Sequence, residues 1–164
     1  MGLCIRTPPK IQTTEIPDWK ELTRYDSVWT KLPAVDLCGK KLFARVVKVY
    51  DGDTVTLKFC LAGVWHAQRI RLMGINTPEL LGGTEQQTAE GCRSRDILAN
   101  MIGNKVVFAI FHKNDKYGRP LVNIYYSPSQ SRLEYSEKLP QDYIDVNRYM
   151  LRLGGAVPYL KKYD

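Results

Sequence analysis

Five strand-like runs, with one helix-like run between the third and the fourth, constrain the fold of this chain most strongly. The runs are short, rich in β-branched and aromatic residues, and alternate in polarity, as half-buried strands do. We expect strands at 42–50, 53–59, 64–73, 105–111 and 119–126, and a helix at 85–102. Asp51-Gly52 separates the first two runs and predicts a hairpin turn.

Glycines mark the expected ends of the helices. Gly103 follows the run at 85–102, and Gly154-Gly155 follows a second helical pattern at about 143–153. Five strands with a helix after the third match a small closed barrel of the OB type. We therefore predict an α+β protein, in which two to three helices pack on a five-stranded OB-fold barrel.

The first forty residues differ in composition from the rest of the chain. Within residues 1–17, three prolines among polar residues indicate an extended arm, and Asp18 and Glu21 have the spacing of a capping box that begins a short helix. We predict an N-terminal arm with a short helix at 1–40 and one globular domain at 41–164. A chain of 164 residues is long enough for such a single core.

The formal net charge of +7 favours a polyanionic partner, although an ordinary solvated basic surface explains the charge equally well. No run of eighteen apolar residues predicts a transmembrane helix. The N-terminus also lacks the hydrophobic core of a secretory signal, which argues against classical secretion and favours an intracellular location.

The first four residues, Met1-Gly2-Leu3-Cys4, have the form of a lipidated N-terminus. However, Arg6 stands where the myristoylation pattern has Ser or Thr. This departure disfavours a lipid anchor at Gly2 or Cys4.

Three short motifs place acidic, carbonyl and guanidinium groups where strands end in turns. They are Asp51-Gly52-Asp53-Thr54-Val55, the segment from Arg69 to Glu79, and Asp115-Lys116-Tyr117-Gly118-Arg119. Carboxylates, a carbonyl-rich turn and arginines suit a hard divalent cation beside a phosphate. The four cysteines include no C-x-x-C pair, which disfavours a zinc site. The motifs together predict a metal-assisted phosphodiesterase.

The order of these motifs, with a helix-like segment between the second and the third, resembles the staphylococcal nuclease family. The resemblance spans roughly Lys41 to Tyr159. It implies an OB-type barrel and calcium-dependent hydrolysis of DNA and RNA with little sequence preference. It also implies that the products carry 3′-phosphates.

The resemblance implies a calcium site at Asp53, Asn76 and the backbone carbonyl of Thr77. Asn76 stands where the family usually has a second metal-binding aspartate. An amide oxygen can coordinate calcium but is neutral, so we expect a weaker site, since ligand charge sets much of the affinity. Asp51 is expected either in the outer shell of this site or as a simple turn residue.

The resemblance also assigns the catalytic residues. Glu79 matches the glutamate regarded as the general base, or the orienter, of the attacking water. Arg71 and Arg119 match two arginines that grip the phosphate, and their planar forks suit bidentate contact with its oxygens. The implied substrate-binding residues are Lys116, Tyr117 and Tyr159.

Two other classes of protein remain open. Nuclease-like repeats of the Tudor-nuclease proteins bind nucleic acid or protein without cleaving, but such repeats typically lose several catalytic residues at once. A single-strand-binding OB module would need exposed aromatic side chains interleaved with basic ones on its strands. Trp65 and Tyr125 are candidates for that role, and core positions explain them equally well.

Overall fold

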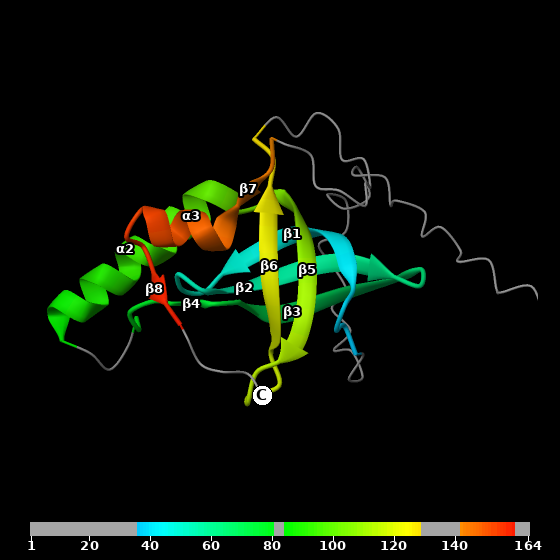
Figure 1. Cartoon of the computed structure of the whole chain (residues 1–164), viewed down its shortest axis with the longest axis horizontal. Coiled ribbons are helices and arrows are strands. Elements are labelled where there is room, and N and C mark those ends of the chain that lie inside the picture. Colours follow the sequence, from blue (N-terminus) through cyan, green and yellow to red (C-terminus); the bar gives the residue numbers. More distant parts are fainter. Residues whose placement is uncertain (1–35, 81–83, 129–141, 160–164) are drawn as a thin grey trace, which may run out of the picture.

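A closed five-stranded β-barrel forms the body of the protein (Figure 1). The computed structural model describes residues 36–80, 84–128 and 142–159. The barrel strands are β1 (Lys41–Val49), β2 (Thr54–Leu61), β3 (Val64–Leu72), β5 (Val106–Asn114) and β6 (Pro120–Tyr126). They lie in the order β3-β2-β1-β5-β6, and a parallel pairing of β3 with β6 closes the barrel. The predicted OB-type barrel is thereby confirmed.

Three strands of two residues each were not predicted from the sequence. β7 (Ile144–Asp145) extends the sheet beside β6, whereas β4 (Ile75–Asn76) and β8 (Val157–Pro158) form a separate two-stranded ribbon. The backbone N–H of Tyr159 donates to the carbonyl of Gly74, 2.9 Å away, at the end of this ribbon. The ribbon therefore brings the second motif next to the last described residues.

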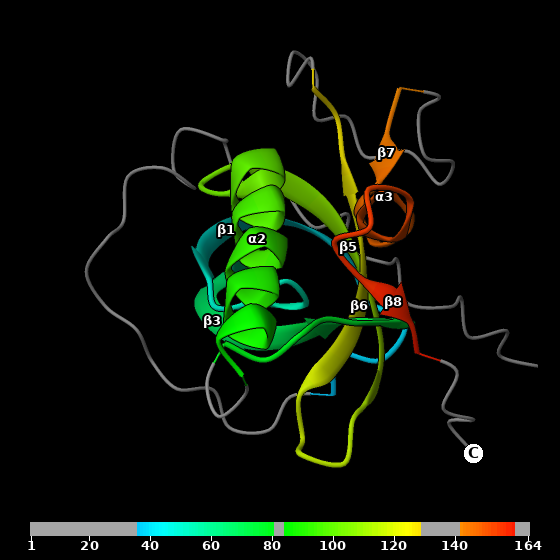
Figure 2. The same cartoon turned by 90° about the vertical axis from the view of Figure 1, so that its left-hand side faces the viewer.

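Two described helices lie on the same side of the barrel (Figure 1). α2 (Glu85–Ile102) follows β4, runs across the barrel (Figure 2), and turns a buried face of Gly91, Ser94, Leu98 and Ile102 inward. Thr84 caps it, because its hydroxyl accepts from the N–H of Gln87 while the Gln87 side chain accepts from the N–H of Thr84. α3 (Val146–Arg152) packs against β6.

The structure corrects the expected start of one helix and confirms the expected end of the other. α3 begins at Val146 and not near residue 143, because the Asp145 carboxylate accepts from the N–H of Arg148 and caps the helix there. Gly103 does end α2, but its φ is −55°, and Asn104 takes the left-handed conformation with φ of 58°. A Cβ on Gly103 would lie 2.4 Å from the carbonyl oxygen of Ala99, so close approach requires the glycine.

A buried amide ties the C-terminal helix to the barrel. The Asn147 side chain donates to the carbonyl of Met73 (2.8 Å) and to that of Val122 (3.1 Å). Its oxygen accepts from the N–H of Ile124, 3.1 Å away. Because β3 and β6 meet at this point, Asn147 holds together the two strands that close the barrel.

Several predictions about the N-terminal segment fall on residues 1–35, which lie outside the described part of the chain. These are the arm helix and the lipid positions Gly2 and Cys4. Within the described part, Leu37 is buried in the barrel core, and the N–H of Gly39 donates to the carbonyl of Phe111. Among the described helices, none is long and apolar enough to cross a membrane.

Candidate functional site

The turn between β1 and β2 fixes the position of Asp53. The N–H of Tyr50 donates to the carbonyl of Thr54 across the hairpin, and the N–H of Asp53 donates to the Asp51 carboxylate, 3.0 Å away. The carbonyl of Asp53 in turn accepts from the N–H of Leu72 on β3, at 2.7 Å. Asp51 therefore shapes the turn, and Asp53 is held against the strand that carries the second motif.

Gly52 lets this turn pack against the second motif. A Cβ at this position would lie 2.7 Å from Cγ2 of Thr77 and 2.7 Å from Cβ of Ser94 on α2. No larger residue fits without displacing one of these neighbours. The buried Thr77, proposed as a carbonyl ligand, thus lies directly beside the turn that holds Asp53.

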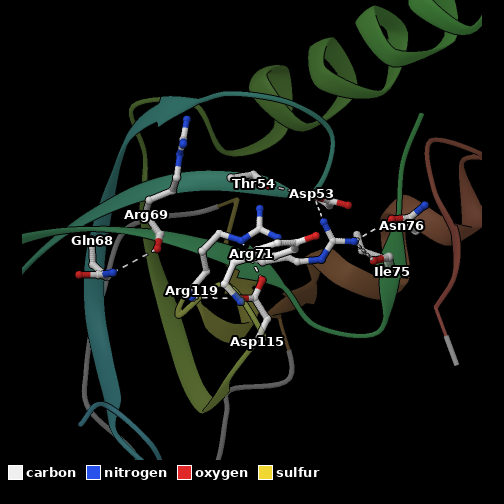
Figure 3. A network of polar contacts seen from close by, with 10 residues as sticks. Asp53, Thr54, Gln68, Arg69, Arg71, Ile75, Asn76, Asp115 and Arg119 are labelled. Atoms are coloured by element: carbon white, nitrogen blue, oxygen red, sulfur yellow. Dashed lines mark hydrogen bonds and ion pairs between the residues drawn. The ribbon is translucent and has the colours of Figure 1, made fainter. Parts of the chain in front are cut away.

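Arg71 joins the residues that the resemblance assigns to the metal (Figure 3). Its Nη1 lies 2.7 Å from Oδ1 of Asp53, and its Nη2 lies 2.7 Å from Oδ1 of Asn76. Nη2 also donates to the carbonyl of Ile75 at 3.3 Å. The guanidinium of Arg71, on β3, thereby joins the turn between β1 and β2 to β4. This bridge from Arg71 to Asp53 and Asn76 was not predicted from the sequence.

Burial gives Asp53 an unusual ionisation. Desolvation raises its pKa to about 6, the charge of Arg71 opposes the rise, and the nearby charge of Asp51 adds to it. A carboxylate in a 2.7 Å ion pair ordinarily has a lowered pKa, but here the Asp53 side chain is only 4% exposed, and its desolvation outweighs the pairing. The attraction of Arg71 therefore does not fully compensate the free-energy cost of burying the ionised carboxylate of Asp53.

Asp115 organises the third motif. Its Oδ1 accepts from the N–H groups of Tyr117 and Arg119, both at 2.9 Å, while Oδ2 accepts from Nε of Arg119 at 2.8 Å. Partial burial opposes these contacts, but they lower the pKa of Asp115 overall. The sequence placed this motif where a strand ends in a turn, and Asp115 shapes that turn. The structure adds a second role, because Asp115 orients Arg119 and leaves both Nη groups of that side chain outside the ion pair.

The parallel pairing that closes the barrel brings the two arginines together. Arg71 pairs with Leu121 of β6, and Arg119 lies two residues before Leu121, directly ahead of that strand. Figure 3 shows Arg119 with its partner Asp115, and Asp53 and Asn76 at the guanidinium end of Arg71. The expectation that the fold unites the second and third motifs is met at this point.

Glu79 lies on the segment between β4 and α2, and its side chain is exposed. It forms no hydrogen bond or ion pair with the described residues, so the Arg71 network does not include it. The backbone around Glu79 nevertheless packs closely against α2. A Cβ on Gly91 of that helix would lie 2.9 Å from the carbonyl oxygens of both Pro78 and Glu79. Gly91 of α2 thus supports the Glu79 segment, a role that was not predicted from the sequence.

Gly91→Ala is expected to destabilise the protein by on the order of 1–2 kcal/mol. The methyl group meets two backbone carbonyls, and such overpacking costs about 1–3 kcal/mol. The better helix propensity of alanine returns up to about 1 kcal/mol. Denaturant unfolding measures the change, and Ala89→Gly, at an exposed position of the same helix, measures the propensity effect alone. A Gly91→Ala protein as stable as the parent would show that this packing is loose.

The other proposed substrate-binding residues lie around the arginines. The guanidinium carbon of Arg71 lies 5.6 Å from the ring centre of Tyr159. The guanidinium carbon of Arg119 lies 5.5 Å from the ring centre of the exposed Tyr117. Nζ of Lys116 lies 4.7 Å from the Tyr117 ring. Aromatic and basic groups therefore flank both arginines.

The two aromatic residues considered for a single-strand-binding module lie elsewhere. Trp65 is half-buried on β3, with Nζ of Lys58 5.4 Å from its ring. Tyr125 is half-buried on β6, opposite Asp145 of β7, and burial raises its pKa. Neither belongs to the described Arg71 network.

The chemistry of the donor set fits a hard cation. Asp53 and Asn76 supply side-chain oxygens, and Thr77 is the next residue after Asn76. The contacts of the Asp53 carboxylate with Arg71 and with the Thr54 hydroxyl both use Oδ1. The described residues contain no cluster of three or more His, Cys, Asp or Glu side chains, so a cation here would depend on few charged ligands.

Comparisons with known proteins give one matching family and several relatives. Residues 69–164 match the family described as staphylococcal nuclease homologue. An uncharacterised endonuclease of Haemophilus influenzae is 33% identical over 69% of this chain and 57% of its own length. The Escherichia coli protein ParB is 30% identical over 73% of this chain and 58% of its own length.

A third relative is an uncharacterised protein of Methanocaldococcus jannaschii. It is 32% identical over 59% of this chain and 55% of its own length. The chain therefore spans little more than half the length of these curated relatives. Since the family match covers more than half of the chain, and the barrel and its united motifs agree with it, the protein belongs to the staphylococcal nuclease homologue family.

Proposed function

We propose that this protein is a calcium-dependent nuclease that hydrolyses phosphodiester bonds of DNA and RNA with little sequence preference and leaves 3′-phosphates. The observation that carries the proposal is the Arg71 bridge between Asp53 and Asn76, with Arg119 directly before the adjacent strand β6. Carboxylate, amide and paired guanidinium groups at one strand edge suit recognition of a phosphodiester.

The two arginines are proposed to hold the non-bridging phosphate oxygens. The contacts of Arg71 with Asp53, Asn76 and Ile75 use three of its five N–H groups and leave two for phosphate. Arg119, anchored through Nε, offers both of its Nη groups. As negative charge builds on the phosphate oxygens, these fixed donors stabilise the transition state more than the ground state.

Glu79 is proposed to accept a proton from the attacking water as the 5′ oxygen leaves. Its exposed carboxylate is not engaged by another described side chain, which suits a group that must contact water and substrate. Calcium, when bound by Asp53, Asn76 and the Thr77 carbonyl, would supply positive charge beside the phosphate. Lys116, Tyr117 and Tyr159 are proposed to bind the neighbouring nucleotide.

One observation favours a second function. Asn76 contributes a neutral oxygen where the family has an aspartate, and Asp53 is the one carboxylate among the three proposed ligands. A catalytically weakened or inactive module that binds nucleic acid or protein would show this loss. Against that alternative, the chain retains Asp53, Arg71, Glu79 and Arg119.

A cleavage assay separates the two functions. The purified protein is incubated with plasmid DNA, single-stranded DNA and RNA, in calcium and in an excess of a calcium chelator. Digestion of all three in calcium, and of none in the chelator, is the expected result. Binding without digestion under both conditions would refute the nuclease and favour the binding module.

Asn76→Asp is expected to tighten calcium binding about tenfold, which corresponds to about 1.4 kcal/mol. The added carboxylate places a full negative charge beside the cation and can still accept from Nη2 of Arg71. Without calcium, repulsion from Asp53 should make the variant slightly less stable. Calorimetric titration measures the affinity, and Asn100→Asp, at an exposed position of α2, adds the same charge elsewhere. Equal affinities of the parent and the Asn76→Asp protein would remove Asn76 from the proposed ligands.

A further inference from the structure

A second group of cations lies beside the candidate site and has no acidic partner among the described residues. The guanidinium carbon of Arg69 lies 3.6 Å from the ring centre of Tyr50, and Nζ of Lys48 lies 4.5 Å from the same ring. The Thr56 hydroxyl donates to the Tyr50 hydroxyl at 3.4 Å. Lys48, Tyr50, Thr56 and Arg69 are called the Tyr50 cluster below.

The strand register places this cluster next to Arg71. Lys48 pairs with Thr56 across β1 and β2, and Thr56 pairs with Arg69 across β2 and β3, so these residues form one row on the sheet. Thr54 and Arg71 form the next row on the same face. Two residues of a strand span about 7 Å, so the row that contains Arg69 lies about 7 Å along the strands from the row that contains Arg71.

The electrostatic surroundings of the cluster are positive. Residues 40–50 and 54–78 contain no Asp or Glu, and the intervening turn has only Asp51 and Asp53. Among the described residues, Arg71, Arg95, Arg119 and Arg148 each pair with an aspartate. Lys48 and Arg69 form no ion pair with a described residue, although both are exposed. Their charges are therefore available to an anionic partner.

We propose that the Tyr50 cluster is a binding subsite for single-stranded nucleic acid, which continues the substrate path away from Arg71 along the outer face of β1, β2 and β3. This inference rests on the proposed function and names a substrate class for the site. Arg69 and Lys48 contact the backbone phosphates that follow the one held at Arg71. The Arg69 plane, supported from behind by Tyr50, offers a surface on which a base stacks.

The chemistry favours a single strand over a duplex. Stacking on an arginine plane requires a base that has left its neighbours, and a single strand provides such bases at little cost. The bases of a duplex are stacked on one another, so a duplex can meet the cluster only through its phosphates. A purely structural cluster would instead stabilise the hairpin and show no preference for the length or form of a nucleic acid.

Binding in a calcium chelator tests the proposal, because no cleavage is then expected. Fluorescence anisotropy of the full chain compares a labelled single strand of about 12 nucleotides, a dinucleotide and a duplex. The variants are Arg69→Ala and Lys48→Ala. Arg152→Ala is the matched control, because this exposed arginine also lies over a tyrosine, 4.9 Å from the ring of Tyr149, but on α3.

Each of the two variants is expected to weaken binding of the longer single strand about five- to tenfold. Affinity for the dinucleotide should change less than about twofold. The slope of log affinity against log salt should become shallower by about 0.7 for each lost cation. Arg152→Ala should leave all three affinities unchanged. Melting temperatures should fall by no more than about 2–4 °C, as expected for an exposed cation–π contact.

Three outcomes would overturn the subsite. They are equal effects of the variants on long and short strands, equal effects on duplex and single strand, and an effect of Arg152→Ala as large as that of Arg69→Ala. A fourth such outcome is a parent protein that binds the longer strand no more tightly than the dinucleotide. A failure of the proposed function gives a different result. The protein would then not cleave nucleic acid in calcium, but it would still show the expected binding preferences in the chelator.

Discussion

Glu79→Gln is expected to lower the rate of phosphodiester cleavage by at least two to three orders of magnitude. The substitution removes the proposed proton acceptor, and general base and electrostatic contributions of one group usually amount to about 10²–10⁴ in rate. The folded protein should survive, because the Glu79 side chain is exposed and forms no hydrogen bond or ion pair with the described residues. Single-turnover cleavage at saturating calcium measures the loss.

Glu85→Gln is the matched control for this substitution. It neutralises another exposed glutamate six residues later, in the first turn of α2. Its cleavage rate should stay within about twofold of the parent, and a small loss of stability is expected, since an acidic side chain near a helix N-terminus contributes about 0.3–1 kcal/mol. Parental turnover by the Glu79→Gln protein would exclude Glu79 as the base.

Arg71→Ala is expected to lower turnover about 10²–10³-fold, because a phosphate donor acting in the transition state is lost. It should also destabilise the protein, since Asp53 is left buried without its ion-pair partner. Breaking such pairs costs about 3–5 kcal/mol. The penalty should be smaller at pH 5 than at pH 7, because burial raises the pKa of Asp53 to about 6 and the neutral form is available below that value.

Arg71→Lys separates stability from catalysis. Lysine keeps a positive charge near Asp53 but cannot reach Asp53, Asn76 and phosphate with one planar fork. The Arg71→Lys protein should therefore regain most of the lost stability and little of the lost turnover. Thermal unfolding and the rate at saturating substrate measure the two quantities. A variant with normal turnover and only a raised Michaelis constant would make Arg71 a ground-state contact.

The sequence predicted much of the fold because the long elements have clear periodicity. All five barrel strands and α2 lie within a few residues of their expected bounds. The two-residue strands β4, β7 and β8 were missed, because so short a segment has no measurable alternation. Asp145 was missed as the start of α3, since the helical pattern by itself extends further toward the N-terminus.

The proximity of the motifs was predicted better than the contacts between their side chains. Motif order indicated Asp53, Arg71 and Arg119 as neighbours, and the parallel pairing of β3 with β6 confirms that the two arginines lie close together. The Arg71 bridge to Asn76 and the Tyr50 cluster depend on strand register and on side-chain direction. The supporting glycines Gly52 and Gly91 depend on packing between distant segments. None of these leaves a pattern in a single sequence.

Asn147 has a consequence for the order in which the protein can become active during synthesis. Its amide bonds to the carbonyl of Met73, 74 residues earlier, and to both Val122 and Ile124 on β6. Asp53, Arg71, Glu79 and Arg119 all leave the ribosome before it. A nascent chain that ends before α3 would contain the four residues proposed for catalysis and metal binding. However, the strands that align the two arginines would lack the hydrogen bonds that Asn147 makes between them. Assembly of the site therefore depends on a residue translated after every one of those four.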